Sequence, residues 1–167
     1  MCIVIDMDVF AQVFSEKSRD HPKYEPVFKW INEGDGKIVY GGETYWKQLK
    51  QSERKIDVIN EYKNKDKVFK ICDNCVDIKE KEAARLIGDS TFNDPHLAGI
   101  LMVSNCRLVC SRDEGARENI KKIFKGTGFN PRFYTGLGSK NILTRRYIPN
   151  NIQKCMGLCL RKTIRKK

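Results

Sequence analysis

The chain of 167 residues contains no apolar run that approaches the roughly 20 residues needed to span a membrane. Its first residues are not expected to be a signal peptide, because the apolar stretch before Asp6 is short and no basic segment precedes it. The apolar fraction of 40% is ordinary and suffices for one domain with a hydrophobic core. We therefore expect a soluble cytoplasmic protein without a membrane partner.

A second pair of cysteines with the CxxC spacing of a zinc site is also missing. Of the seven cysteines, Cys72 and Cys75 have the CxxC spacing of half a zinc site, and no second pair has that spacing. Several cysteines fall inside apolar runs, where reduced cysteine behaves as a small hydrophobe. The pattern favours free, buried thiols in a reducing compartment over structural or catalytic zinc.

Acidic residues are absent from the last 49 residues of the chain. All 21 of them lie at or before Glu118, and 13 lysines and arginines follow it. The first 118 residues carry 19 basic and 21 acidic side chains, so the whole positive excess behind the net charge of +11 lies after Glu118. This asymmetry predicts a polyanionic partner, most often a nucleic acid. The alternative is a solvated tail that keeps the protein soluble.

Segments with strand patterns alternate with segments of helical periodicity, and no repeat or low-complexity block interrupts them. The expected strands cover residues 2–6, 37–40, 68–72, 107–111 and 132–134. The expected helices cover residues 8–14, 22–32, 52–64, 77–87 and 114–124, with two more that begin at Glu43 and Pro95. This alternation predicts a three-layer α/β/α fold with a mostly parallel central sheet.

A globular domain over residues 1–135 is expected to precede a basic tail over 136–167. Gly136, Gly138 and Ser139 are typical of a hinge, and residues 150–165 have helical spacing with an apolar side and a basic side. Such a helix could pack on the domain, dock a partner or bind RNA. The expected nucleic-acid-binding residues are Lys140, Arg145, Arg146, Arg161 and Lys162.

Four acidic residues fall where strands end or helices begin. Asp6 ends the first strand, and Asp113 follows the strand over residues 107–111. Glu43 lies in the first turn of a helix, and Asp94 precedes another. Ligands of α/β sheets bind beyond the carboxyl ends of the strands, where gathered carboxylates repel one another unless a cation lies between them. Oxygen ligands in this number suit Mg²⁺ or Mn²⁺.

Each of these residues also has an ordinary structural interpretation. Asp94 and Asp113 are typical helix N-caps, and Glu43 is favoured in a first turn by the helix dipole. Asp6 is harder to explain by solvation alone, because it ends a buried strand. His96, near the start of a helix, is expected to be a surface residue or a hydrogen-bonded core residue rather than a catalyst.

Three segments together resemble the motifs of PIN-domain nucleases. Ile3–Phe10 resembles the opening motif, which is an apolar strand ending in Asp, then a small polar residue, then an apolar helix. Asp94–Ala98 resembles the third motif, an Asp that opens a helix. Leu108–Asp113 resembles the fourth, an apolar strand followed by Ser or Thr, any residue, and Asp. Glu43 matches the usual second acid, and order and spacing agree over residues 2–134.

This resemblance implies a metal-dependent endoribonuclease that cleaves single-stranded RNA. It implies that Mg²⁺ or Mn²⁺ is held by Asp6, Glu43, Asp94 and Asp113, with Ser111 supporting the first and last acids. The ion would orient a water, lower its pKa and neutralise charge in the transition state. Many small bacterial members are toxins, so an antitoxin protein and a homo-oligomer are candidate partners.

Two positions depart from the family pattern. Asp8 stands where Asn, Ser or Thr is usual, and Glu114–Ala116 replaces a second Asp and an aromatic residue. Asp8 is either a fifth carboxylate or a helix cap, and Asp89 is a further acid near the third motif. A catalytically idle PIN domain that binds RNA or protein is the main alternative. A receiver-type phosphotransfer domain is disfavoured, because no clean Lys partner follows residues 107–111.

Overall fold

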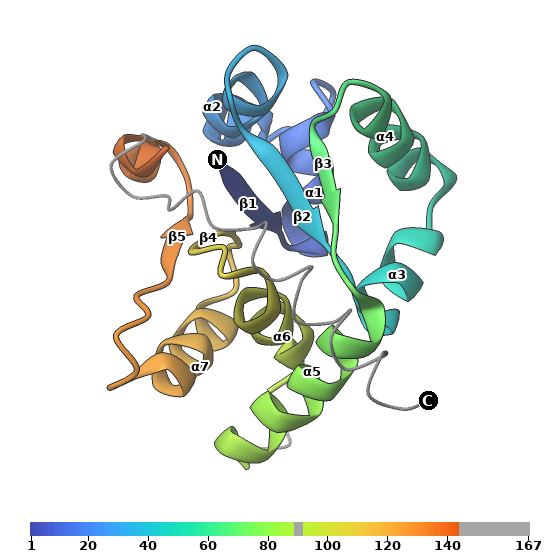
Figure 1. The fold of residues 1–167 in the computed structure, drawn as a ribbon. Helices are drawn as coiled ribbons and strands as arrows, with labels where there is room; N and C mark the ends of the chain where they lie inside the picture. Colours follow the sequence, from blue (N-terminus) through green and yellow to red (C-terminus); the bar gives the residue numbers. More distant parts are fainter. Residues whose placement is uncertain (89–91, 144–167) are drawn as a thin grey trace.

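The computed structural model describes residues 1–88 and 92–143. Its centre is a sheet of five strands in the order β3-β2-β1-β4-β5, and all neighbouring strands pair in parallel (Figure 1). The strands are β1 Cys2–Ile5, β2 Lys37–Tyr40, β3 Val68–Lys70, β4 Leu108–Cys110 and β5 Arg132–Tyr134. With helices on both sides, this confirms the three-layer α/β/α fold.

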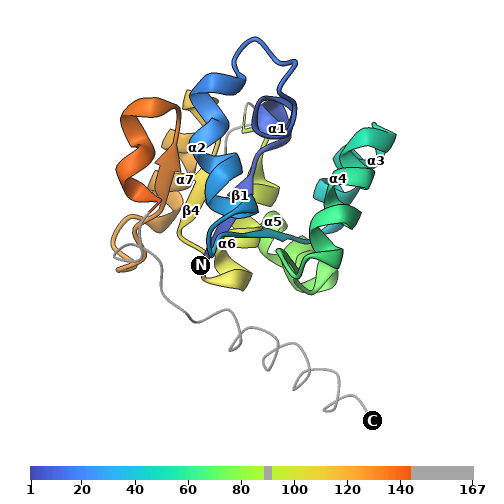
Figure 2. The same cartoon turned by 90° about the horizontal axis from the view of Figure 1, so that it is seen from above.

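The helices divide between the two faces of the sheet. They are α1 Met7–Phe14, α2 His21–Asn32, α3 Glu43–Lys50, α4 Glu53–Asn64, α5 Asp73–Ile87, α6 Pro95–Ser104 and α7 Glu114–Phe124. The chain runs from β1 to β3 in one direction and then crosses back to β4 and β5, so right-handed connections place α1–α4 and α5–α7 on opposite faces. Accordingly, α1 contacts α2, and α5, α6 and α7 contact one another (Figures 1 and 2). None of these helices is long and apolar enough to cross a membrane.

The core lies on both sides of the sheet. Every residue of β1 and β4 is buried, which is why these strands are continuous apolar runs rather than alternating ones. Helix α6 is apolar around most of its surface and packs closely against α5. A Cβ at Gly99 would lie 2.9 Å from the backbone nitrogen of Glu80 and 3.0 Å from the carbonyl oxygen of Val76. Only glycine at this position permits the two helices to approach so closely.

The cysteines in apolar runs contribute to this core. Cys2, Cys106 and Cys110 are buried and have free thiols, as the sequence predicts. Burial raises the pKa of the Cys106 and Cys110 thiols well above their ordinary value. The expectation of free, buried thiols is wrong at two positions: Cys72 has a free thiol but is exposed, and Cys75 is disulfide-bonded.

Helix α5 differs most from the sequence-based expectation. It begins at Asp73 rather than at Asp77, and Cys72 is its N-cap in an extended conformation. The added first turn contributes one buried apolar residue, Val76, and a single residue sets no helical period. Both Asp73 and Asp77 accept hydrogen bonds from the start of α3, which accounts for their place in a helix that faces another element.

The first residues of the expected tail are part of the folded body. Leu137–Ile142 forms a short 3-10 helix, η1, that contacts α2 and β5, and Leu143 packs against the core. Lys140 lies in η1 and is exposed. Other expectations lie outside the described residues: the helix over 150–165, the acid Asp89, and the basic residues Arg145, Arg146, Arg161 and Lys162.

Candidate functional site

A crevice is expected beyond the carboxyl ends of β1 and β4, because the chain leaves these neighbouring strands toward opposite faces of the sheet. Asp6 follows β1, and Ser111 follows β4. The hydroxyl of Ser111 donates a hydrogen bond to Oδ2 of Asp6 at 2.6 Å, and the Asp6 backbone nitrogen donates to the carbonyl oxygen of Cys110 at 2.9 Å. Two contacts with the end of β4 therefore hold Asp6 at the switch point, the place where the chain leaves β1 and β4 toward opposite faces of the sheet.

Three aspartates are the N-caps of three helices around this point. Asp6 caps α1, and its Oδ1 accepts from the Asp8 backbone nitrogen at 3.3 Å. Asp113 caps α7, and its Oδ1 accepts from the Ala116 nitrogen at 2.8 Å. Asp94 occupies the N-cap position of α6 without a capping hydrogen bond. The N-cap and site interpretations are thus compatible, because helix N-termini favour negative charge.

The pKa values of Asp6 and Asp94 depend on the charges of the neighbouring aspartates. Asp6 is 4% exposed, and burial raises its pKa, against the lowering effect of hydrogen bonds from Ser111 and the Asp8 amide. The charges of Asp8 and Asp113 raise the pKa of Asp6 further. Burial, followed by the charges of Asp6, Asp113 and Asp8, raises the pKa of Asp94 to about 7. Asp8, whose role the sequence leaves open, therefore belongs to the same cluster.

The donor type in this cluster fits a hard cation, since carboxylate oxygens are the preferred ligands of Mg²⁺ and Mn²⁺. The side chains do not form a complete set of metal ligands: over residues 1–88 and 92–143, no three His, Cys, Asp or Glu side chains are placed to hold one ion. The charges of the neighbouring aspartates hinder the ionisation of Asp6 and Asp94. A cation bound among them would remove that repulsion.

Glu43 is placed apart from the four aspartates. It is the first residue of α3, and its carboxylate, 68% exposed, forms an ion pair with Lys47 at 3.0 Å. Its charge contributes to the raised pKa of Glu80 on α5, whereas the charges that raise the pKa of Asp94 are those of the other aspartates. In the described structure the second candidate acid thus belongs to a neighbouring acidic group.

The start of α3 is capped by another helix. Its N-cap is Gly42, which has no side chain to accept from the first free N–H groups. The Gly42 nitrogen donates to Oδ1 of Asp73 at 2.9 Å, and the Glu43 nitrogen donates to Oδ1 of Asp77 at 2.7 Å. Sequence reasoning missed both capping residues. The only sequence signal was the glycine N-cap, which indicates that acceptors must come from elsewhere.

His96 lies directly behind Asp94. The imidazole is fully buried, and burial lowers its pKa to about 4, so it is neutral at pH 7. Its Nδ1 is 3.9 Å from Oδ1 of Asp94, and neither ring nitrogen has a hydrogen-bond partner among residues 1–88 and 92–143. The ring packs on Tyr45, whose hydroxyl donates to the carbonyl oxygen of Ile5 at 2.7 Å, one residue before Asp6. A core position was one of two expectations for His96; the hydrogen bond expected with it is not found in the part of the chain that the structure describes.

Comparison with known proteins assigns no family to this chain. No protein-family model, no curated protein and no solved structure matches it. The function of the crevice is therefore inferred from its own residues and from the motifs that carry the PIN-domain resemblance.

Proposed function

We propose that this protein is a metal-dependent endoribonuclease that hydrolyses single-stranded RNA in the crevice beyond β1 and β4. The observation that supports this most is the burial of Asp6 at the switch point, held by Ser111 and surrounded by the charges of Asp8, Asp94 and Asp113. Clustered carboxylates favour a divalent cation, and a chain of net charge +11 attracts a phosphodiester polyanion.

The proposed metal ligands are Asp6, Asp94 and Asp113, with Glu43 as a fourth candidate. A bound Mg²⁺ or Mn²⁺ supplies a Lewis acid that activates water and neutralises charge at the phosphate. Ser111 is the proposed positioning residue. Its hydroxyl donates to Asp6 and also accepts from the Asp113 backbone nitrogen at 3.1 Å, so one side chain connects the first and last acids.

A second candidate function is an idle domain that binds RNA or protein without cleaving it. Two observations favour it: no three described side chains are placed to hold one ion, and the carboxylate of Glu43 is paired with Lys47. In either case an antitoxin protein or a second copy of the chain is a candidate partner. Co-purification of the protein with the product of an adjacent gene would test the antitoxin.

The two functions are separated by a cleavage assay on a panel of unstructured RNAs with Mg²⁺, Mn²⁺ or a chelator. Wild type is expected to cleave only with metal. Asp6→Asn should lower the rate roughly a hundredfold or more, because a metal ion stabilises transition-state charge by several kcal/mol. Asp57→Asn, the same change at an exposed site on α4, should cleave as wild type does. RNA binding without metal-dependent cleavage by wild type would contradict the nuclease and support the idle domain.

A further inference from the structure

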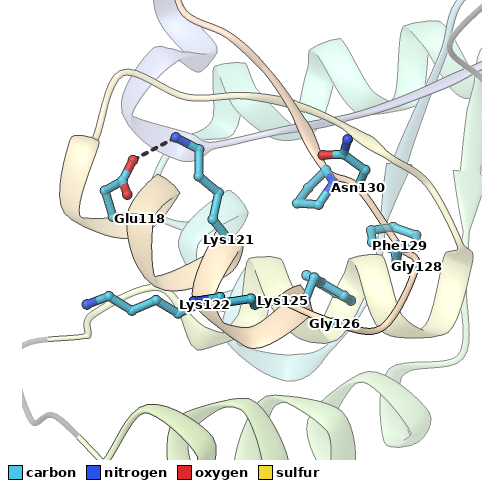
Figure 3. A pocket seen from close by; sticks show the side chains of 10 residues that line it. Glu118, Lys121, Lys122, Lys125, Gly126, Gly128, Phe129 and Asn130 are labelled. Carbon is cyan, nitrogen blue, oxygen red and sulfur yellow. Dashed lines mark hydrogen bonds and ion pairs between the residues drawn. The ribbon is translucent and has the colours of Figure 1, made fainter.

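A pocket of about 600 Å³ opens between the end of α7 and the loop that leads into β5 (Figure 3). The residues that matter for its chemistry are Lys121, Lys122, Phe124, Lys125, Phe129 and Pro131. Because this loop precedes a strand of a parallel sheet, the pocket lies at the amino edge of the sheet. Asp6 and Ser111 follow strands and lie at the opposite edge. The pocket is therefore a separate feature of the molecule.

The positive charge of the pocket is mostly unneutralised. Lys121 forms an ion pair with Glu118 at 2.6 Å, and Glu118 is the last acidic residue of the chain (Figure 3). Lys122 and Lys125 have no ion pair within the described ranges. Lysines in the last turn of a helix complement the helix dipole, which accounts for Lys121 and Lys122. It does not account for Lys125, which follows the helix, or for the cavity beside it.

An aromatic ring, that of Phe129, lines the same pocket as these lysines (Figure 3). Phe129 is partly exposed and packs on the buried Phe124 with ring centroids 4.4 Å apart, and the guanidinium of Arg107 lies 5.3 Å from the Phe129 ring centroid. The loop has a defined shape, because the Thr127 hydroxyl donates to the Phe124 carbonyl oxygen and accepts from the Phe129 nitrogen. Gly126 adopts a left-handed conformation with φ of 79°. The loop thus holds the ring in the lining of the pocket that the lysines also line.

We propose that this pocket binds one nucleotide of single-stranded RNA, with the base against Phe129 and the phosphate at Lys122 and Lys125. Cations beside an aromatic face are the combination that binds single strands, and a paired base could not lie against the ring. An acidic peptide would use the lysines but not the ring. The choice of RNA rests on the proposed nuclease function. A strand that also reaches the aspartates would have to span the sheet, so the pocket anchors the substrate away from the cleavage site.

The test measures binding of a long unstructured RNA by fluorescence anisotropy over a range of salt, with Asp6→Asn present in every variant to prevent cleavage. Lys122→Gln/Lys125→Gln should flatten the slope of log affinity against log salt by about 1.4, or roughly 0.7 for each lost phosphate contact. Lys63→Gln/Lys81→Gln, the same charge change on α4 and α5, should leave the slope unchanged. Phe129→Leu should weaken RNA binding about fivefold or more at constant slope.

Each arm has a result that overturns the proposal. A folded Lys122→Gln/Lys125→Gln variant with the slope of its control excludes the pocket as an RNA site. A Phe129→Leu variant that binds RNA as tightly as before excludes the base contact. An equal loss of affinity for RNA and for heparin excludes it too, since heparin is a polyanion without bases. The wild-type cleavage assay separates the two proposals. RNA binding through the pocket without any cleavage refutes only the nuclease, and cleavage with unaltered binding by the lysine variant refutes only the pocket.

Discussion

At the scale of single residues, Asp94 and His96 oppose each other in their effect on stability. Asp94 has its pKa raised from 3.8 to about 7, so it stabilises the metal-free fold at low pH, and this contribution is lost as the pH rises from about 4 to about 7. His96 has its pKa lowered from 6.5 to about 4, so its contribution is lost as the pH falls through that range. A variant at one position separates the two effects.

Asp94→Asn should stabilise the metal-free protein at pH 8, where the wild-type carboxylate is ionised next to three other aspartates. The gain is at most about 4 kcal/mol, because one pKa unit corresponds to about 1.4 kcal/mol. At pH 4 the gain should largely vanish. Thermal unfolding in chelator at both pH values measures it, with Asp57→Asn on α4 as the matched control. An equal gain at both pH values would contradict the assignment of the charge repulsion to Asp94.

Ser111→Ala should lower stability by about 1–3 kcal/mol, because a buried carboxylate loses a hydrogen bond. It should also weaken the response of the melting temperature to Mn²⁺, since Asp6 and Asp113 lose their shared support. Ser104→Ala is the matched control: its buried hydroxyl donates to the Ile100 carbonyl oxygen and accepts from the Cys106 nitrogen, away from the aspartates. A similar Mn²⁺ response in both variants would refute the positioning role of Ser111.

At the scale of elements, the positions of α3 and α5 depend on each other. The N-terminus of α3 has a glycine N-cap, and aspartates of α5 supply the missing acceptors. Most element positions follow from local patterns: α7 and β5 fall within the expected bounds, and Ser52 precedes α4 as expected. The early start of α5 does not follow from a local pattern, because contacts with α3, and not an apolar stripe, fix its first turn.

Asp77→Ala should cost about 1 kcal/mol of stability, the usual loss when a helix N-terminus loses its capping acceptor. If Glu43 takes part in metal binding, cleavage should also fall, because the start of α3 loses one of its two anchors on α5. Chemical denaturation and the RNA cleavage assay measure the two effects. Asp57→Ala, an exposed change inside α4, is the control and should alter neither. A stability loss without a change in cleavage would remove Glu43 from the site.

At the scale of the whole molecule, metal binding should stabilise the fold. A ligand that binds only the folded state adds about 2.7 kcal/mol at a hundredfold excess over Kd, or roughly 5–10 °C in Tm for a domain of this size. Differential scanning fluorimetry with saturating Mn²⁺ should show this rise in wild type and a much smaller one in Asp6→Asn. An unchanged Tm in wild type would remove the main support for the metal site.

Residues 144–167, the last part of the chain, should govern RNA affinity rather than the chemistry of cleavage. Residues 144–167 contain eight lysines and arginines, so their removal should flatten the salt dependence of RNA binding by about 0.7 for each lost contact. Turnover at saturating RNA should change little, because the aspartates of the crevice remain. Anisotropy titrations and single-turnover rates measure the two quantities, and Tm reports any loss of stability. A truncated, folded protein with an unchanged salt slope would exclude RNA binding by this segment.

Much of the fold follows from local sequence patterns. Apolar runs without alternation predict strands covered on both faces, and their alternation with helical stripes predicts the parallel sheet. The positions of Asp6 and Asp113 after strands predict that they lie at one edge, because parallel strands end at the same side of a sheet. These features depend only on residue spacing and chain direction, which a sequence contains in full.

The membership of the site was decided by the tertiary structure. Strand order places β1 beside β4, so Ser111 joins Asp6, while Glu43 beyond β2 faces Lys47 and the acids of α5. The burial of His96 behind Asp94 and the pocket beside Phe129 likewise arise from packing between distant segments. Such contacts have no local period, because they depend on which elements become neighbours and how closely their side chains pack.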